Sequence, residues 1–265
     1  MQVGIVGAGN VGEALARRLV DAGYRVRVAN ARGAASLVDF ARRTGAEAVN
    51  IEDVAASANI LILAVPIQRV VDLPKSLFVG RSHSMVVVDT ANYVPSLVGT
   101  INEIDAGMPE SEWVSRQIGV PVVKAFNSMT AYSMAHGGRS KAASDRIAVP
   151  VAADDPQARA MIMVLVEQLG FTGFDAGPIA QSWRQQPGQP TYATDPTVVE
   201  LPGLLNRADR KRAPANRDKA MKLMAKLPAD FPVTDLVRVA RLSVGLDKLN
   251  PRSWLAMVRV GLASL

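Results

Sequence analysis

The sequence predicts an α/β protein with a doubly wound, mostly parallel sheet and a C-terminal helical extension. Short β-like runs alternate with helical patterns up to about residue 175, which is typical of a parallel sheet covered by helices on both faces. The first β-like run ends in a glycine-rich turn that opens a helix. Beyond residue 202 the remaining pattern is helical only, with prolines between its segments.

Apolar runs and their periodicity place the individual elements. We expect strands over residues 3–6, 25–29, 46–49, 59–65, 85–89, 120–125, 146–152 and 171–175. We expect helices over residues 11–22, 36–44, 156–169, 214–227, 234–246 and 251–263. The run at 59–65 is apolar on both faces, as a central parallel strand should be, and Pro66 stops it.

The texture of the sequence divides the chain into three parts. Residues 1–180 carry the alternating pattern and form the predicted nucleotide-binding domain. Residues 181–202 are polar, proline-rich and aromatic, and predict an ordered loop. Residues 203–265 predict a basic helical extension.

Composition excludes several kinds of chemistry. The 265 residues are 49% hydrophobic and contain no cysteine, which removes disulfides, thiolate zinc sites, iron–sulfur clusters and a cysteine nucleophile. With His83 and His136 as the two histidines, we expect no metal site. No apolar run reaches the 18 or more residues of a membrane span, and the start resembles no secretory signal. We therefore expect a cytoplasmic protein without membrane contact.

One segment carries the whole net charge of +6. Eight basic and two acidic residues lie between positions 205 and 226. The segment has no aromatic residue to stack on bases, so a solvated helix is favoured over nucleic-acid binding. Attraction of an anionic cofactor or substrate tail is a further possibility.

The glycine-rich turn is the most informative motif. Residues 7–12 read Gly-Ala-Gly-Asn-Val-Gly, a G-x-G-x-x-G between a predicted strand and a predicted helix. Gly7 permits the tight turn, Gly9 lets the backbone approach a pyrophosphate, and Gly12 allows close helix packing. The helix N-terminus supplies N–H groups and partial positive charge. The turn therefore predicts a Rossmann dinucleotide site, against the alternative of a tight turn without a ligand.

The end of the second strand indicates which dinucleotide binds. An NAD site usually has a carboxylate there, whereas this tip reads Asn30-Ala31-Arg32-Gly33. Arg32 can hold a 2′-phosphate with its planar fork of donors, and Asn30 can donate beside it. We predict NADP(H) over NAD(H); the alternative is that Arg32 is a solvated surface residue.

Three further strand ends should meet at the same edge of the sheet. Ala64, Val65 and Pro66 offer an apolar wall for ribose or nicotinamide. Asn92 and Asn127 could fix the nicotinamide carboxamide. Phe126 is as consistent with the core as with a cofactor contact.

These motifs, in this order and spacing, resemble the NADP oxidoreductases dependent on the deazaflavin coenzyme F420. The resemblance also includes 123–127, Val-Lys-Ala-Phe-Asn, and covers residues 1 to about 180. It implies a Rossmann protein, commonly a homodimer, that passes hydride directly between nicotinamide and deazaflavin rings. The cofactor contacts that it implies are Gly9, Asn10, Val11, Asn30, Arg32, Val65, Pro66 and Ala125.

The sequence departs from the family in two places. Ser36 and Leu37 stand where a further cation often follows the second-strand arginine. Residues 182–194 and everything after Pro202 look like additions to the compact family enzyme. Because the deazaflavin coenzyme is restricted in distribution, the acceptor could be a deazaflavin, a flavin, a quinone or a small carbonyl compound.

Candidate catalytic and substrate residues follow from these alternatives. Transfer between two stacked rings needs alignment and exclusion of water more than a proton donor. Lys124 becomes a candidate acid only if the substrate is a carbonyl or imine; otherwise it is a salt-bridging or capping lysine. His83 and His136 are more consistent with surface positions than with catalysis.

The ordered loop supplies the candidate second-substrate residues Trp183, Arg184 and Tyr192, with Gln185 beside them. Their aromatic faces and guanidinium group could hold a ring with an anionic substituent. Alternatively, the Trp-Arg pair locks the C-terminal extension onto the main domain. Three functions remain open: an oxidoreductase with a ring-type acceptor, a carbonyl or imine reductase, and a non-catalytic NADP(H)-sensing regulator.

Overall fold

The computed structural model describes residues 1–78 and 85–264 and contains a six-stranded parallel sheet in the order β3-β2-β1-β4-β5-β6. This is the strand order of a Rossmann sheet. The chain adds strands toward one edge from β1 to β3 and toward the other edge from β4 to β6, so the order of strands reverses between β1 and β4. The strands are β1 Gln2–Val6, β2 Arg25–Ala29, β3 Glu47–Ala48, β4 Ile60–Leu63, β5 Val86–Asp89 and β6 Val123–Lys124. The predicted fold class is therefore confirmed. His83 lies outside the described residues.

The central strand β4 shows why the sheet is parallel and covered on both faces. All four of its residues are buried. Ile60 and Ile62 belong to one hydrophobic cluster, and Leu61 and Leu63 belong to the other. Successive side chains of a strand point to opposite faces, so a strand apolar at every position needs a core on each side.

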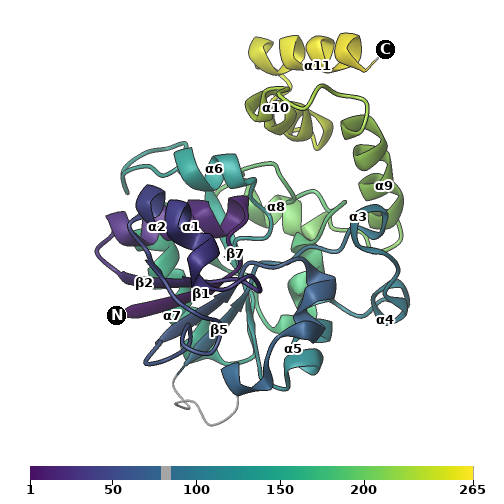
Figure 1. Ribbon diagram of the computed structural model, residues 1–265. Helices are drawn as coiled ribbons and strands as arrows, with labels where there is room; N and C mark the ends of the chain where they lie inside the picture. The colour runs from purple at the N-terminus through teal and green to yellow at the C-terminus, as the bar shows by residue number, and fades with distance from the viewer. Residues whose placement is uncertain (79–84, 265) are drawn as a thin grey trace.

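Helices from different parts of the chain build the two cores. On one face lie α1 Asn10–Asp21, α2 Val38–Thr44, α6 Ala131–His136 and α7 Pro156–Gln168. On the other face lie α5 Glu110–Ile118 and the 3-10 helices η2 Ile67–Asp72 and η3 Lys75–Leu77. Figure 1 shows α1 and α2 together on one side of the sheet and α5 on the other.

The last two predicted strands do not extend the main sheet. β7 Ala148–Val151 and β8 Thr172–Asp175 form a parallel pair of their own. An antiparallel bridge between Lys124 and Ala152 joins this pair to the main sheet. The strand β6 ends at Lys124, and two residues later Phe126 adopts a left-handed backbone with φ +63°. The chain thus turns away before a longer ladder can form.

The C-terminal part is helical, as predicted, but contains more than three helices. It begins with the 3-10 helix η4 Ile179–Gln185 inside the predicted loop, followed by α8 Leu201–Asn206, α9 Ala213–Met224, α10 Val233–Ser243 and α11 Pro251–Ala263. In Figure 1, α10 and α11 form a hairpin beyond the main body, and α9 leads up to it. The division into domains at 180 and 202 stays a prediction.

Several short helices were not predicted. They are η1 Ala34–Leu37, η2, η3, η4, α3 Pro95–Val98, α4 Asn102–Asp105, α5, α6 and α8. Segments this short carry too few turns for an apolar stripe, and tertiary packing stabilises them. In α8, for example, Leu201 and Leu205 pack on Ala148 of β7.

Arginine side chains fasten the helical extension to the body. Arg241 of α10 donates to the carbonyl oxygens of Thr194 and Asp195 at 3.0 and 3.1 Å, and its guanidinium is paired with Glu200 and Asp247, each at 2.9 Å.

Along the described chain, no helix combines the length and the apolar character needed to traverse a bilayer.

Candidate dinucleotide-binding site

The glycine turn has the geometry of a phosphate cradle. Gly7 has φ +114°, and a methyl group there would lie 2.2 Å from the Ala64 carbonyl oxygen. A methyl group at Gly12 would lie 2.1 Å from the carbonyl oxygen of Gly7. At Gly9, by contrast, a methyl group would meet no heavy atom of the described residues within 4 Å. The first and third glycines are therefore required by packing, whereas the space beside Gly9 is open to a ligand.

The N-terminus of α1 faces this open space without a capping side chain. The N-cap residue is Gly9, which has no side chain that could accept from the first N–H groups of the helix. The N–H groups of a helix's first turn have no partner inside the helix and attract anions. Glu13 is the acidic residue of this turn, and Arg43 at 2.8 Å and Arg17 at 3.3 Å pair with its carboxylate. These ion pairs offset a charge that would otherwise disfavour a phosphate nearby.

The tip of β2 is folded so that Arg32 points outward. The Asn30 Oδ1 atom accepts from the Arg32 backbone N–H at 2.8 Å and from the Ser36 hydroxyl at 3.1 Å. Gly33, with φ +81°, continues the turn. Arg32 is exposed, and its guanidinium pairs with no carboxylate in residues 1–78 or 85–264. It is thus available to an anion, and the Ser36 hydroxyl lies within the same turn.

The second half of the sheet supplies the other expected contacts. Ala64 and Val65 are half-buried and Pro66 is exposed directly after β4. Ala125 is fully buried after β6, so any contact that it makes must be through backbone. Asn92 is half-buried after β5.

Asn127 lies behind Asn92 instead of beside it at the surface. Its side chain is 2% exposed, and its amide nitrogen donates to the Asn92 Oδ1 at 3.2 Å and to the Gln185 carbonyl oxygen at 2.8 Å. The Gln185 amide donates in turn to the Asn127 Oδ1 at 3.1 Å. These bonds use both donors of Asn127. Its observed contacts are thus to Asn92 and to η4, and its contact with the nicotinamide carboxamide stays a prediction.

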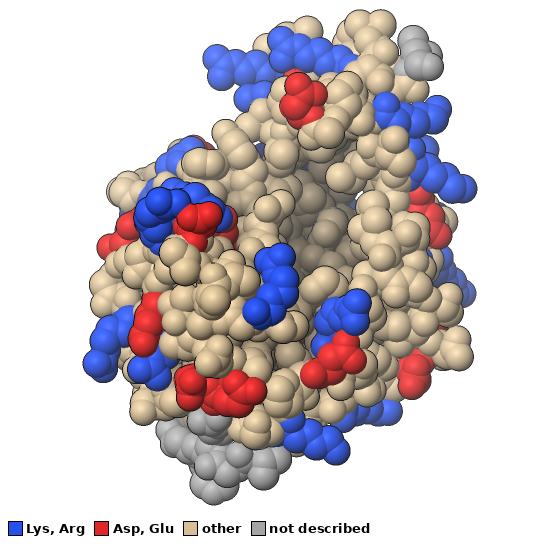
Figure 2. All heavy atoms as spheres, in the orientation of Figure 1, with Lys and Arg blue, Asp and Glu red and all other residues tan. Residues whose placement is uncertain are grey.

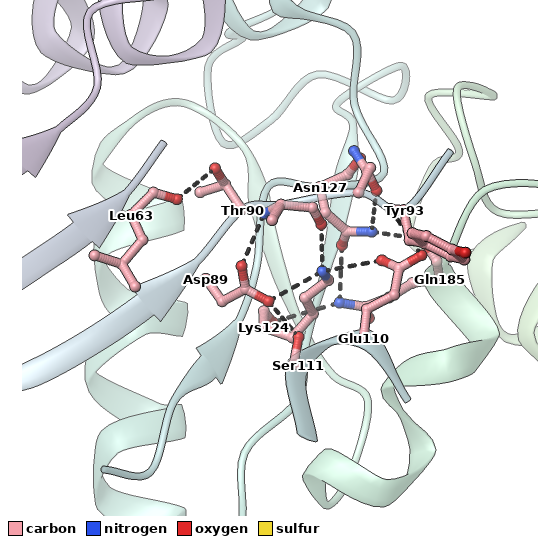
Figure 3. A network of polar contacts seen from close by, with 11 residues as sticks. Leu63, Asp89, Thr90, Tyr93, Glu110, Ser111, Lys124, Asn127 and Gln185 are labelled. Carbon is pink, nitrogen blue, oxygen red and sulfur yellow. Dashed lines mark hydrogen bonds and ion pairs between the residues drawn. The ribbon is translucent and has the colours of Figure 1, made fainter. Parts of the chain in front are cut away.

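Below these amides is a buried group of charged side chains that sequence reasoning missed (Figure 3). The Lys124 ammonium lies 3.2 Å from Asp89 Oδ2, 3.4 Å from Glu110 Oε2 and 2.5 Å from the Ala91 carbonyl oxygen. All three charged side chains are buried. Ser111 donates to Asp89 at 2.6 Å. An acidic residue on the unpredicted helix α5 gave no signal that it would meet a strand end.

Two carboxylates share one ammonium in this cluster. Asp89 also accepts from the Ala91 N–H at 2.8 Å and from the Ser111 hydroxyl, so its carboxylate accepts more hydrogen bonds from the protein than that of Glu110. Burial raises the pKa of Glu110 to about 7, and the Lys124 charge offsets only part of that effect. Glu110 therefore titrates near neutral pH.

Lys124 is a salt-bridging residue, one of the two roles that the sequence left open. Its side chain is 0% exposed and its nitrogen is surrounded by three oxygens of the protein. It cannot reach a carbonyl or imine outside the sheet without leaving both carboxylates. His136 is exposed at the end of α6, with its ring 4.6 Å from that of Tyr132.

The candidate second-substrate residues separate into two groups. The Arg210 guanidinium lies 4.5 Å from the centre of the Trp183 ring, that of Arg184 lies 6.0 Å away, and Arg210 also donates to the Gly107 carbonyl oxygen at 2.9 Å. Trp183 thus connects the body to the start of the helical extension, as the locking alternative predicts. Tyr192 is half-buried, and burial followed by the Glu110 charge raises its pKa to about 12.

Figure 2 shows the surface deeply hollowed between the body and the helical extension, with α10 and α11 above the hollow and α9 and α3 beside it. Strained backbone occurs just after β6 and in the segment that follows η4. Phe126, Ala193 and Asp195 have positive φ values of +63°, +56° and +42°. The Ala193 N–H donates to the Ser128 carbonyl oxygen at 2.8 Å, which joins the loop to the β6 end. Such strain persists only where surrounding contacts hold it.

The strand order and the open glycine cradle define a Rossmann dinucleotide-binding protein. A model of the family described as NADP oxidoreductase coenzyme F420-dependent matches residues 2–93. The hypothetical protein SMa0349 from Sinorhizobium meliloti is 30% identical in sequence, with 74% of this chain and 95% of that chain covered and a TM-score of 0.65. The chain belongs to this family of NADP-dependent oxidoreductases.

Two further proteins resemble this chain. A candidate F420-dependent NADP reductase from Arthrobacter sp. FB24 is 25% identical, with 69% of this chain and 87% of that chain covered and a TM-score of 0.57. The Escherichia coli (strain K12) protein YjhV is 43% identical over 60 residues, which are 23% of this chain and 44% of YjhV. The match thus spans less than half of this curated relative.

Proposed function

We propose that the protein transfers hydride between NADP(H) and a ring-type acceptor, namely a deazaflavin, a flavin or a quinone. The observation that carries the proposal is the open space at Gly9 beside the N-terminus of α1, together with the Arg32 guanidinium just beyond β2, which no carboxylate of residues 1–78 and 85–264 pairs with. A diphosphate fits the first feature and a 2′-phosphate fits the second.

The residues divide between the two halves of the cofactor. Gly9, Asn10 and Val11 would hold the pyrophosphate, and Asn30 and Arg32 would hold the 2′-phosphate. The nicotinamide end would lie beyond the second half of the sheet, where Ala64, Val65, Pro66, Asn92 and Ala125 follow strand ends. When bound, the nicotinamide supplies the hydride chemistry, and the protein supplies orientation and exclusion of water.

The burial of the Lys124 ammonium between protein oxygens favours a ring-type acceptor over a carbonyl or imine. Reduction of a carbonyl needs a proton donor within hydrogen-bond reach of the substrate, and Lys124 is enclosed by Asp89, Glu110 and Ala91. Transfer between two rings needs no such donor at this place. We propose that Arg184 of η4 and Tyr192, in the segment that follows η4, contact the acceptor. Trp183 would support them through Arg210.

An anaerobic NADPH-oxidation screen tests the proposal. The acceptors are a deazaflavin, FMN, FAD and a soluble quinone, each compared with a reaction containing NADH and one containing a small imine. We expect oxidation of NADPH with one ring-type acceptor and a clear preference over NADH. Turnover with the imine alone would replace the proposal by the reductase alternative, and NADPH binding without any turnover would favour the regulator.

We also propose a homodimer, as the family resemblance implies. Trp254, Val258 and Leu262 recur every four residues on α11 and are 53%, 56% and 68% exposed. A second copy of the same helix would cover them with an equivalent face. Light scattering of the wild type and of Val258→Glu checks this: we expect a dimer that the substitution weakens, whereas a monomeric wild type would contradict it.

A further inference from the structure

We propose that the buried Lys124 and Glu110 are positioning residues that fix Asn92 for contact with the nicotinamide end of the cofactor. The inference rests on the proposed function and goes beyond it, because it gives the missed charged cluster a task in cofactor recognition. It also gives Lys124 a role different from that of an acid.

Hydrogen bonds fix the backbone of residues 91–93, the turn after β5, on both sides of Asn92. Before it, Ala91 donates its N–H to Asp89 at 2.8 Å and its carbonyl oxygen accepts from Lys124 at 2.5 Å. After it, the Tyr93 N–H donates to Glu110 Oε1 at 3.1 Å. Every one of these bonds to the flanking backbone is made by a buried charged side chain. Hydrogen bonds to charged groups are stronger than neutral ones, so the turn has little freedom.

The Asn92 side chain is oriented from a second direction. Its Nδ2 donates to the Asn127 carbonyl oxygen at 3.0 Å, and its Oδ1 accepts from the Asn127 amide at 3.2 Å. A carboxamide has two N–H donors and an oxygen with two lone pairs. One donor and one lone pair of Asn92 therefore remain after these bonds, and Asn92 is half-buried, unlike the fully enclosed Asn127.

A remaining donor–acceptor pair on one carboxamide matches another carboxamide, which is the polar group of nicotinamide. The strand that Asn92 follows, β5, lies in the second half of the sheet, where the nicotinamide half of a dinucleotide binds. Figure 3 shows the charged cluster, Asn127 and Gln185 arranged around the turn after β5. The cluster contacts the backbone of the turn, and Asn92 would contact the nicotinamide carboxamide.

The decisive variant is Glu110→Gln, because it keeps the shape of the side chain. The glutamine oxygen can still accept from Tyr93, but its amide group faces the Lys124 ammonium, where two donors meet. The hydrogen bonds from the charged cluster to the backbone of Ala91 and Tyr93 are then weakened, while the volume of the side chain is kept. Asn92→Ala removes the side chain that these bonds are proposed to position.

Two ligands separate positioning from general damage. NADPH spans both halves of the site, whereas adenosine 2′,5′-bisphosphate reaches only the glycine cradle and Arg32. By titration calorimetry we expect Asn92→Ala to weaken NADPH binding about 10-fold, in line with one lost polar pair. We expect Glu110→Gln to weaken it about 5-fold in the wild-type background and less than about 2-fold in the Asn92→Ala background. Binding of the bisphosphate should change less than about 2-fold in Asn92→Ala, in Glu110→Gln and in the double variant.

A matched control is Asp235→Asn, which neutralises another buried carboxylate. Asp235 is 2% exposed and pairs with Arg238 at 2.8 Å and with Arg259 at 3.2 Å, between α10 and α11. Both ligands should bind this variant as they bind the wild type. If Glu110→Gln does not fold, Asn127→Ala frees Asn92 without disturbing a buried charge and should show the same pattern.

Each other outcome overturns the proposal. An equal loss from Glu110→Gln in both backgrounds, or a parallel loss for the bisphosphate, would show a structural role alone. Wild-type protein that binds the bisphosphate but gains nothing from the nicotinamide half would refute positioning while leaving the cradle intact. Wild-type protein that binds neither ligand would end the proposed function together with this inference.

Discussion

The two glycines Gly9 and Gly12 offer a paired test of the phosphate cradle, because the same substitution should act on binding at one and on stability at the other. Alanine at Gly9 would place its methyl group in space with no heavy atom within 4 Å. The backbone there, with φ −82° and ψ −173°, suits alanine. Alanine at Gly12 would place its methyl group 2.1 Å from the Gly7 carbonyl oxygen.

The expected magnitudes follow from these contacts. At Gly9 the gain from a less flexible unfolded chain, about 0.4–1 kcal/mol, is offset by a poorer helix cap of similar size, so stability should change little. The methyl group would occupy the approach path of the pyrophosphate, and we expect NADPH affinity to fall at least about 10-fold, or about 1.4 kcal/mol. At Gly12 the overlap requires the helix to move away from the strand, which should cost about 1–3 kcal/mol.

Calorimetric titration with NADPH and thermal unfolding without ligand measure the two effects. Gly12→Ala should lower Tm by several degrees, since about 1 kcal/mol corresponds to about 2–4 °C in a chain of this size. Gly9→Ala should leave Tm unchanged within about 2 °C. Normal NADPH affinity in Gly9→Ala, with its fold intact, would refute the cradle assignment. Unchanged Tm in Gly12→Ala would refute the close packing.

Three other predictions test the charge assignments. Arg32→Ala should raise the KM for NADPH about 10- to 100-fold and leave that for NADH nearly unchanged, and steady-state kinetics showing equal effects would contradict the 2′-phosphate site. Because the pKa of Glu110 is raised from 4.5 to about 7, the folded protein holds a proton that the unfolded chain releases in this window. The Glu110 contribution to stability should therefore decrease as the pH rises from about 4.5 to 7, a slope that urea unfolding should show in the wild type but not in Glu110→Gln. Arg241→Met should destabilise the attachment of the extension by about 2 kcal/mol and speed proteolysis near α9, whereas unchanged cleavage would show that other contacts hold it.

Local patterns were sufficient to predict the sheet and the backbone geometry of the glycine turn. The G-x-G-x-x-G turn and the Asn30-Ala31-Arg32 tip act through backbone conformation and through side chains within a few positions of one another. The four-residue strand β4 is apolar at every position, which indicates burial on both faces before any neighbour is known. Such features are readable because the residues that interact are close in the sequence.

The interior of the site could not be predicted in the same way. Glu110 lies on a helix of nine residues whose pattern gave no prediction, and it meets Lys124 only because α5 packs beside the strand ends. Gln185, 58 residues from Asn127, occupies the amide group that the sequence had assigned to the cofactor. A strand-end position indicates proximity to a ligand but does not say which side chains protein partners already occupy.

The sequence by itself therefore determined the fold class, and it was enough to predict a diphosphate cradle and a 2′-phosphate contact, because each of these depends on short-range backbone geometry and on the type of a single side chain. Only the tertiary structure shows which protein groups contact Lys124, Asn127 and Trp183. Their partners Glu110, Gln185 and Arg210 come from separate segments, and burial gives these pairings energies that no local pattern encodes.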